Sequence, residues 1–217
     1  GTLKTEGSSG FRLDGLLRIS GGTIDTQNGN PASTGYIRAS NTGAAKFEIT
    51  SGILNLGGSF RRDIESSTMV VDYKQTGGTA NIGLNSAGIL TTKGVFEVLG
   101  NNSKFVYTGG SLVLVHSNGS QLIPSLNITA GSSNVTQDIQ LGSIATVDAG
   151  FQRSFGLLSS ISLGGLILNN QGLDPDALVL SSNLELSGTL ELTSGTIFDL
   201  NDKTLLIGGD MIDAGQF

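Results

Sequence analysis

The fold is decided by a stretch that reads Phe105-Val106-Tyr107-Thr108-Gly109-Gly110-Ser111-Leu112-Val113-Leu114-Val115. Two runs of aromatic, β-branched and aliphatic residues flank a short corner of small residues, and residues of these types favour strands. Glycine accepts positive φ and lets backbones approach closely, so the corner suits a bend. The stretch therefore predicts a strand, a corner and a second strand.

The same unit recurs along the chain, which is the signature of a repeat architecture. Its corners are Ser20-Gly21-Gly22-Thr23, Ser51-Gly52-Ile53-Leu54, Thr76-Gly77-Gly78-Thr79, Thr108-Gly109-Gly110-Ser111 and Thr129-Ala130-Gly131-Ser132, with shorter forms at Ser187-Gly188-Thr189 and Ser194-Gly195-Thr196. The first five corners begin 31, 25, 32 and 21 residues apart. Their flanks alternate between apolar and polar residues, as in Phe47-Glu48-Ile49-Thr50, so one side of each strand is expected to face inward.

Recurrence at this spacing predicts an all-β protein, a right-handed parallel β-helix. One coil cannot bury its apolar side alone, so coils must stack over a continuous core. A β-sandwich or barrel is the alternative, but it would show turns at shorter intervals without a repeated unit. No linker divides the chain, so residues 1–217 are interpreted as a single continuous solenoid. Both ends fall within the pattern, which predicts a segment of a longer protein, truncated at both ends.

Composition excludes several classes of function. The net charge is −6, and Arg61-Arg62 is the only adjacent pair among twelve Lys and Arg residues, so nucleic acid is not an expected partner. The absence of cysteine excludes disulfides and thiolate metal sites. No apolar run approaches ~18 residues, so membrane insertion as a helix is not expected.

Carbohydrate-active enzymes can be built on β-helices, and hydrolysis of glycosides needs two carboxyl groups ~5–9.5 Å apart. The candidate pairs are Asp63 with Glu65 and Asp174 with Asp176. The spacing of the first pair is also that of any two neighbours on one side of an exposed strand. The second pair flanks a proline, which is typical of a turn. His116 is the only histidine, which excludes a histidine triad and a multi-histidine metal centre. We therefore predict no catalytic residues, no cofactor and no enzymatic activity.

Two weaker sites are also suggested by residue type. Asp199, Asn201 and Asp202 offer oxygen ligands for calcium, although the loop glycine and distant glutamate of a calcium loop are missing and a tight bend is the alternative. Tyr36 and Tyr73 are candidates for contact with a glycan.

The final third resembles the β-helical repeats of large surface proteins of Bacteroidetes-type bacteria. The resemblance is carried by Leu184-Glu185-Leu186-Ser187-Gly188-Thr189-Leu190-Glu191-Leu192-Thr193-Ser194-Gly195-Thr196 and by residues 199–210, and Gly119–Ile128 resembles the segment that precedes such coils. It covers residues 105–217 best, and autotransporter passenger domains have a similar texture. The resemblance implies a giant adhesin-like protein, exported by the type IX secretion system to the extracellular side of the bacterial cell surface.

These observations predict a structural or adhesive segment of a secreted surface protein, which acts as a stiff stalk or as a binding surface. The expected partners are other segments of the same giant protein, proteins of a surface assembly, or glycans. Two alternatives stay open. One is a carbohydrate-active β-helix, either a polysaccharide lyase or hydrolase or a glycan-binding module, and the other is a subunit or transported substrate of a larger surface assembly.

Overall fold

A computed structural model describes residues 1–4, 10–27, 35–39, 44–62, 70–85, 89, 92–119, 123–143, 153–169 and 176–216. In these ranges the regular secondary structure consists of strands. The strands are β1 (Thr2–Lys4), β2 (Phe11–Leu13), β3 (Leu16–Asp25), β4 (Ile37–Ala39), β5 (Ala44–Leu56), β6 (Phe60–Arg62), β7 (Val70–Ile82), β8 (Phe96–Leu114), β9 (Leu126–Val135), β10 (Asp138–Leu141), β11 (Arg153–Ser159), β12 (Gly165–Leu168), β13 (Asp176–Leu180), β14 (Leu184–Leu186), β15 (Leu190–Leu192), β16 (Ile197–Asp199), β17 (Leu205–Ile207) and β18 (Met211–Asp213).

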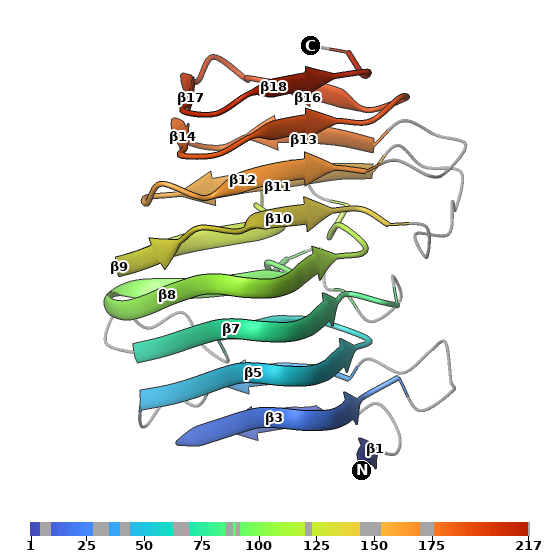
Figure 1. Cartoon of the computed structure of the whole chain (residues 1–217), viewed down its shortest axis with the longest axis vertical. Coiled ribbons are helices and arrows are strands. Elements are labelled where there is room, and N and C mark those ends of the chain that lie inside the picture. The colour runs from blue at the N-terminus through green and yellow to red at the C-terminus, as the bar shows by residue number, and fades with distance from the viewer. Residues whose placement is uncertain are drawn as a thin grey trace.

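The strands stack as parallel ladders, and the chain rises from β1 at one end to β18 at the other (Figure 1). One ladder runs β1-β3-β5-β7-β8-β10-β12-β15-β18, and a second runs through β2, β4, β6, β8, β9, β11, β13 and β16. A separate pair, β14 and β17, forms a further side near the C-terminal end. Strands that pair are one coil apart in sequence, as where Leu17 pairs with Phe47 and Phe47 with Tyr73. The predicted parallel solenoid of stacked coils is confirmed.

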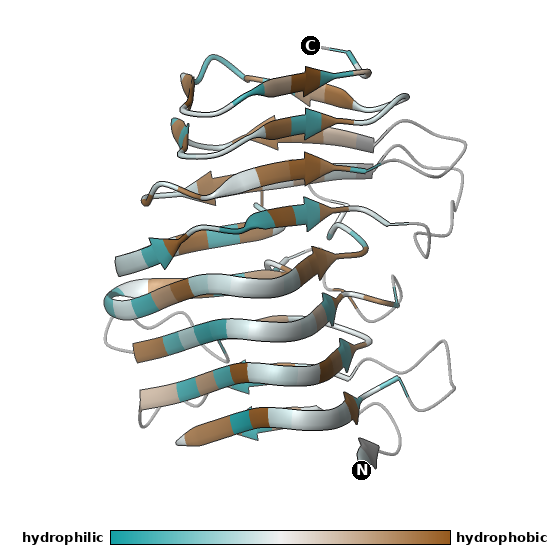
Figure 2. Ribbon diagram, in the orientation of Figure 1, coloured by the Kyte–Doolittle hydropathy of each residue, from teal (hydrophilic) through white to brown (hydrophobic). Residues whose placement is uncertain are grey.

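The small-residue corners do not interrupt the long strands. β3, β5, β7 and β8 continue through them for 10 to 19 residues, and Figure 2 shows the corners as a pale band between the teal and brown segments of these strands. Register shifts occur beside Ser20 and Thr76, so the motifs at these positions are bulges within one strand. The predicted strand-corner-strand unit is wrong for these long strands, because Ser and Thr can stay in the ladder while glycine takes up the bend. It is confirmed at the two shorter motifs, since Ser187-Gly188-Thr189 lies between β14 and β15 and Ser194-Gly195-Thr196 lies between β15 and β16.

A column of glycines lets the bends of successive coils stack. Gly52, Gly78 and Gly110 have φ of 90°, 70° and 87°. A Cβ on Gly52 would lie 2.6 Å from the carbonyl oxygen of Gly22, and one on Gly78 would lie 2.6 Å from that of Gly52. These positions therefore require glycine for two reasons: the backbone has a positive φ, and the neighbouring coil leaves no room for a Cβ.

Gly78→Ala is expected to destabilise the protein more than Gly119→Ala. Gly119 has a similar φ of 67° but nothing within 4 Å of its Cβ position, so alanine there brings only the backbone strain of about 1–2 kcal/mol. Gly78→Ala adds a clash with backbone, which should destabilise by roughly 1–3 kcal/mol more. Urea unfolding of both variants measures the difference, and equal losses would show that coil contact at the bend is unimportant.

The core of the N-terminal coils contains two columns of stacked aromatic rings. Phe47, Tyr73 and Phe105 stack with ring centroids 5.4 and 5.6 Å apart. Phe60 and Phe96 stack at 5.3 Å in the second column, and rings of the two columns meet edge to face, as for Tyr73 and Phe96 at 5.0 Å. Offset and edge-to-face contacts are the favourable arrangements of aromatic rings, so these columns stabilise the stack beyond the burial of apolar area. In-register pairing places the rings in line.

A buried polar network connects the core to the bends. The Tyr73 hydroxyl donates to Gln75 Oε1 at 2.6 Å, and Gln75 Nε2 donates to the Ser111 carbonyl one coil away at 2.9 Å. The Tyr107 hydroxyl accepts from the N–H of Leu112 at 3.0 Å and lies 3.2 Å from the Asp138 carbonyl, to which it donates. Because burial disfavours the phenolate, the pKa of Tyr73 is raised well above its usual value and that of Tyr107 to about 12.

Stability should therefore fall at high pH, because the raised pKa means that the folded state favours the neutral phenol. The contribution is complete below pH 10, the ordinary pKa of tyrosine, and is lost as the pH rises toward 12. For Tyr107 the loss amounts to at most about 2.7 kcal/mol, because one pKa unit corresponds to 1.36 kcal/mol. Urea unfolding between pH 9 and 12 should show a shallower decline for Tyr107→Phe than for the parent. Tyr36→Phe, which removes a hydroxyl outside this network, is the control, and identical slopes for Tyr107→Phe and the parent would contradict the assignment.

Candidate functional site

The outward side of β3, β5, β7 and β8 carries charges that alternate in sign from coil to coil. The in-register ladders are Lys46–Asp72–Lys104 and Arg18–Glu48–Lys74. Arg18 Nε lies 2.7 Å from Glu48 Oε2, and Asp72 Oδ1 accepts from the backbone N–H of Lys104 at 3.1 Å. Opposite charges directly across a ladder are favourable, so this side stabilises the coil register.

On the outward side of β2, β4 and β6 the charges do not alternate, because three arginines occupy equivalent positions in successive coils. Arg12 pairs in register with Arg38, and Arg38 pairs with Arg61. We call these three residues the arginine ladder. Like charges directly opposite one another destabilise a sheet, so this arrangement differs in kind from the alternating side.

Tyr36 supports the arginine ladder with its ring. The guanidinium carbon of Arg38 lies 4.1 Å from the ring centroid and that of Arg61 5.9 Å, both within cation–π range. Arg38 also donates from Nη2 to the Tyr36 hydroxyl. Arg61 is 7% exposed, and its Nε donates to Ser59 Oγ at 3.0 Å. The ladder is thus held in place by specific contacts, with Arg12 the most exposed of its members.

A groove of about 470 Å³ lies next to the C-terminal end of the ladder, because the pairing of Phe60 with Phe96 places its lining residue Glu97 in register with Arg61. Arg62 and Lys93 bring positive charge to its wall, and Glu97 is the only carboxylate among the described residues that line it. Glu97 is 8% exposed, and its Oε1 accepts from the N–H of Gly94 at 3.0 Å. Asn127, in register with Glu97, has a buried Oδ1 with no hydrogen-bond donor. The groove therefore combines cations with an unmet acceptor and one constrained acid.

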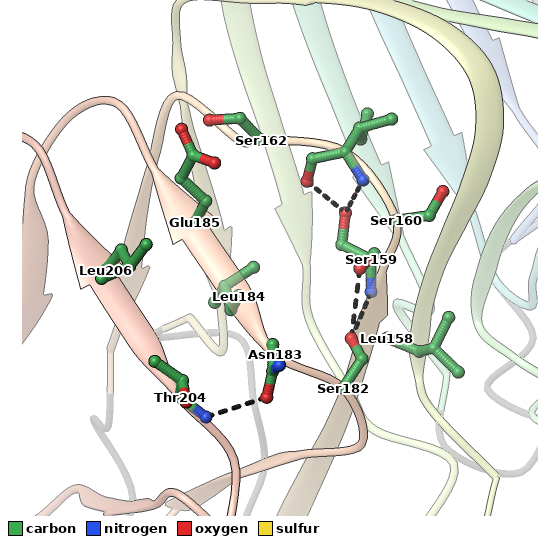
Figure 3. Close-up of a pocket in the computed structure, with 11 residues that line it drawn as sticks. Leu158, Ser159, Ser160, Ser162, Ser182, Asn183, Leu184, Glu185, Thr204 and Leu206 are labelled. Carbon is green, nitrogen blue, oxygen red and sulfur yellow. Dashed lines mark hydrogen bonds between the residues drawn. The ribbon is translucent and has the colours of Figure 1, made fainter.

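A second groove of about 610 Å³ adjoins the first, because Leu158 lines both. Figure 3 shows hydroxyl and amide side chains around it, together with Leu184, Leu206 and Glu185. The pairing of Leu163 with Leu186 places Ser162 opposite Glu185, and Glu185 pairs in turn with Leu206. This groove crosses successive coils and carries a single carboxylate among its described lining residues.

Three polar side chains of the second groove already hold the backbone corner in shape. Ser182 Oγ accepts from the N–H of Ser159 and donates to its carbonyl, both at 3.1 Å. Ser159 Oγ donates to the Ile161 carbonyl at 2.8 Å, and Asn183 Oδ1 accepts from the N–H of Thr204 at 3.0 Å (Figure 3). These groups are structural, so the second groove offers fewer free contacts than its composition suggests.

The two tyrosines predicted to contact a glycan differ in their exposure. Tyr73 is 0% exposed and belongs to the aromatic column, so its predicted contact with a sugar is wrong: its side chain points inward on the same side of β7 as Val71 and Gln75, both buried. Tyr36 is partly exposed, but Arg38 covers its ring. A contact of Tyr36 with a glycan stays a prediction.

The calcium candidates form a tight turn. Asn201 and Asp202 have φ of 48° and 58°, Asp199 Oδ1 accepts from the N–H of Asn201 at 2.8 Å, and Asn201 Nδ2 donates to the Leu180 carbonyl at 3.0 Å. Asp199 and Asn201 thus hold the bend between β16 and β17. Across the described part of the chain, no group of three or more His, Cys, Asp or Glu side chains is placed to hold a metal ion.

Calcium is accordingly expected to leave stability unchanged, because the oxygen of Asp199 is already engaged within the turn. A thermal melt in millimolar calcium should match one in chelator to within ~1 °C, since a ligand stabilises only in proportion to its affinity for the folded state. A larger shift that Asp199→Asn abolishes would establish the predicted calcium site.

The remaining candidate acids cannot be placed from the described ranges. Asp63, Glu65 and Asp174 lie outside the described residues, as does the side chain of Asp176. His116 is 5% exposed, and its Nδ1 lies 2.7 Å from the Gly83 carbonyl, a contact that joins adjacent coils.

No helix in the described ranges has the length and apolar character needed to cross a bilayer. Comparison with protein-family models, with curated proteins and with solved structures finds no match. The chain's function must therefore be argued from its own surfaces.

The arginine ladder and the groove beside it are the features that sequence reasoning missed. One signal was present: ten of the twelve Lys and Arg residues precede residue 126, whereas ten of the eighteen acids follow it. The alignment of arginines on one side was not visible, because it depends on coil register.

Proposed function

We propose that this chain is a structural and adhesive segment of a bacterial cell-surface protein, a stiff rod that carries a ligand-binding side. The proposal is supported by the parallel ladder that runs without a break in pairing from β1 to β18 over one core. Each coil is held by backbone hydrogen bonds to both neighbours and by side-chain ladders between them. Such a stack is a rigid scaffold for contacts that repeat along its length.

The location at the cell surface and the export route rest on the resemblance of the C-terminal third to β-helical surface repeats. The adhesive role rests on the outer sides of the coils. The charge-alternating side neutralises itself through contacts such as Arg18 with Glu48. The arginine ladder and the adjoining grooves place cations and polar groups along the rod, as a surface for an extended partner would.

Adhesion can be measured directly with beads that carry the folded chain. Under shear flow, these beads should be retained on surfaces coated with polysaccharide or glycoprotein for longer than beads that carry the heat-unfolded chain. The reason is that only stacked coils align the contacts along one side. Equal retention of the two kinds of bead on every surface would contradict an adhesive role.

The same preparation separates adhesion from catalysis. Incubation with acidic and neutral polysaccharides should release neither reducing ends nor unsaturated uronates, because each groove presents only one carboxylate among its described residues. Release of either product, abolished by Glu97→Gln or Glu185→Gln, would establish the enzymatic alternative.

A further inference from the structure

We infer that the two grooves, which meet at Leu158, form one binding site for a linear, uncharged polysaccharide lying along the axis of the rod. This inference rests on the proposed adhesive function and specifies its ligand. It is carried by two buried side-chain oxygens that have no hydrogen-bond partner, Asn127 Oδ1 in the first groove and Ser162 Oγ in the second.

These two oxygens lack what their neighbours have. Ser159 and Ser182 also line the second groove, and the Oγ atoms of both are bonded to backbone groups. A buried polar atom without a partner costs free energy. Asn127 and Ser162 are each partly exposed as residues, so rotation of either side chain can turn its oxygen toward the groove, where a ligand hydroxyl can donate to it. A ligand with hydroxyl groups therefore removes a cost that the free protein bears.

The site follows the rod from coil to coil. Asn127 pairs in register with Leu158 on the next coil. On the adjoining side, Ser162 lies opposite Glu185, and Glu185 pairs with Leu206 (Figure 3). These residues occupy four successive coils, which span about 14 Å at ~4.8 Å per coil. The interval between coils is comparable with the length of one pyranose unit in an extended glycan, so the site suits about four units.

The exposed side chains along this path suit the two kinds of surface that a sugar presents. Leu206 is 60% exposed, and Leu158 and Ile161 are partly exposed. The C–H groups of a pyranose ring can pack against such aliphatic side chains and gain dispersion contacts. Glu185 is exposed beside them, and a carboxylate accepts strong hydrogen bonds from hydroxyl groups.

The charges of the grooves favour an uncharged ligand over an acidic one. Arg62 and Lys93, which line the first groove, each have an interaction partner in the protein. Glu97 lines the same groove, and Glu185 lines the second. A polyanion would have to compete for the cations and would be repelled by the two carboxylates. An uncharged glycan meets neither obstacle.

Two other extended polymers fit the site less well. A peptide in the extended conformation binds by adding a strand to a free sheet edge. Asn127 instead lies on the outward side of β9, whose edges already pair with β8 and β11. A single-stranded nucleic acid is bound by stacking its bases on aromatic rings. None of the described residues that line the two grooves is aromatic.

Two double variants with the same chemical changes test the inference. Asn127→Leu/Ser162→Ala removes both oxygens that lack a partner. Asn134→Leu/Ser132→Ala makes the same changes at exposed positions of β9 that line neither groove. The probes for calorimetry are cello-, xylo- and manno-oligosaccharides of two to six units. Polygalacturonate, an oligothymidylate and a decapeptide of alternating threonine and glutamine represent the other ligand classes.

The parent chain should bind at least one of the three neutral series, with an affinity that rises up to about four units, one per coil, and then levels off. The affinity should be nearly equal at ~50 and ~200 mM salt, because no counterions are released from an uncharged ligand. The site variant should lose at least ~10-fold in affinity, since two hydrogen bonds to the glycan are removed. The control variant should lose less than ~2-fold.

Thermal melts separate binding from a structural role. Because the two oxygens have no partner in the free protein, the site variant should melt no lower than the control variant. If the double site variant does not fold, Ser162→Ala alone serves, with Ser132→Ala as its match.

The inference would be overturned by absence of binding to all three neutral series, by equal losses in the two variants, or by tighter binding of polygalacturonate, the oligonucleotide or the peptide. A site variant that melts well below the control would also overturn it, because the oxygens would then be structural. Bead retention on glycoprotein surfaces would still stand as a separate test of adhesion.

Discussion

The structure depends on the close, in-register approach of one coil's backbone to the next. At the bends this approach leaves no room for a side chain, which is why Gly52 and Gly78 each lie against a carbonyl of the preceding coil. Once the bends stack, the strands on either side must pair residue for residue, apart from the shifts at the bulges. A column of like positions then runs along every side of the rod.

In-register stacking brings the side chains at equivalent positions of successive coils into contact along a column. In the core, this stacking produces the aromatic column of Phe47, Tyr73 and Phe105, whose rings stack because the three residues occupy paired positions of successive strands. Outside, it produces ladders of charge. The charges alternate in sign along β3, β5, β7 and β8, whereas arginines follow one another along β2, β4 and β6, so the two sides of this solenoid differ in their cross-strand charge pairs.

Much of the fold was predictable from the sequence, because the glycine-containing bends are local features that recur. That Tyr73 is buried could also have been anticipated, since it shares the parity of Val71 and Gln75 in an alternating strand. The bulged nature of the bends could not be foreseen, because Thr and Ser suit a turn and a strand alike. Nor could the arginine ladder, because loop lengths differ between the two sides of a coil: Arg12, Arg38 and Arg61 are 26 and 23 residues apart, whereas the first three bends are 31 and 25 apart.

The alignment of the arginine ladder follows from the register of the stacked coils, and because the sequence contains no cysteine, engineered thiols can measure that register. Arg12→Cys combined with Arg38→Cys places two thiols on directly paired residues, at a Cα separation suited to a disulfide. The matched control is Arg12→Cys with Ala39→Cys, because Ala39 is 2% exposed and faces the core. Mild oxidation should give an intramolecular disulfide in the first variant and leave the control reduced. A disulfide in the control but not in the first variant would contradict the register that aligns the arginine ladder.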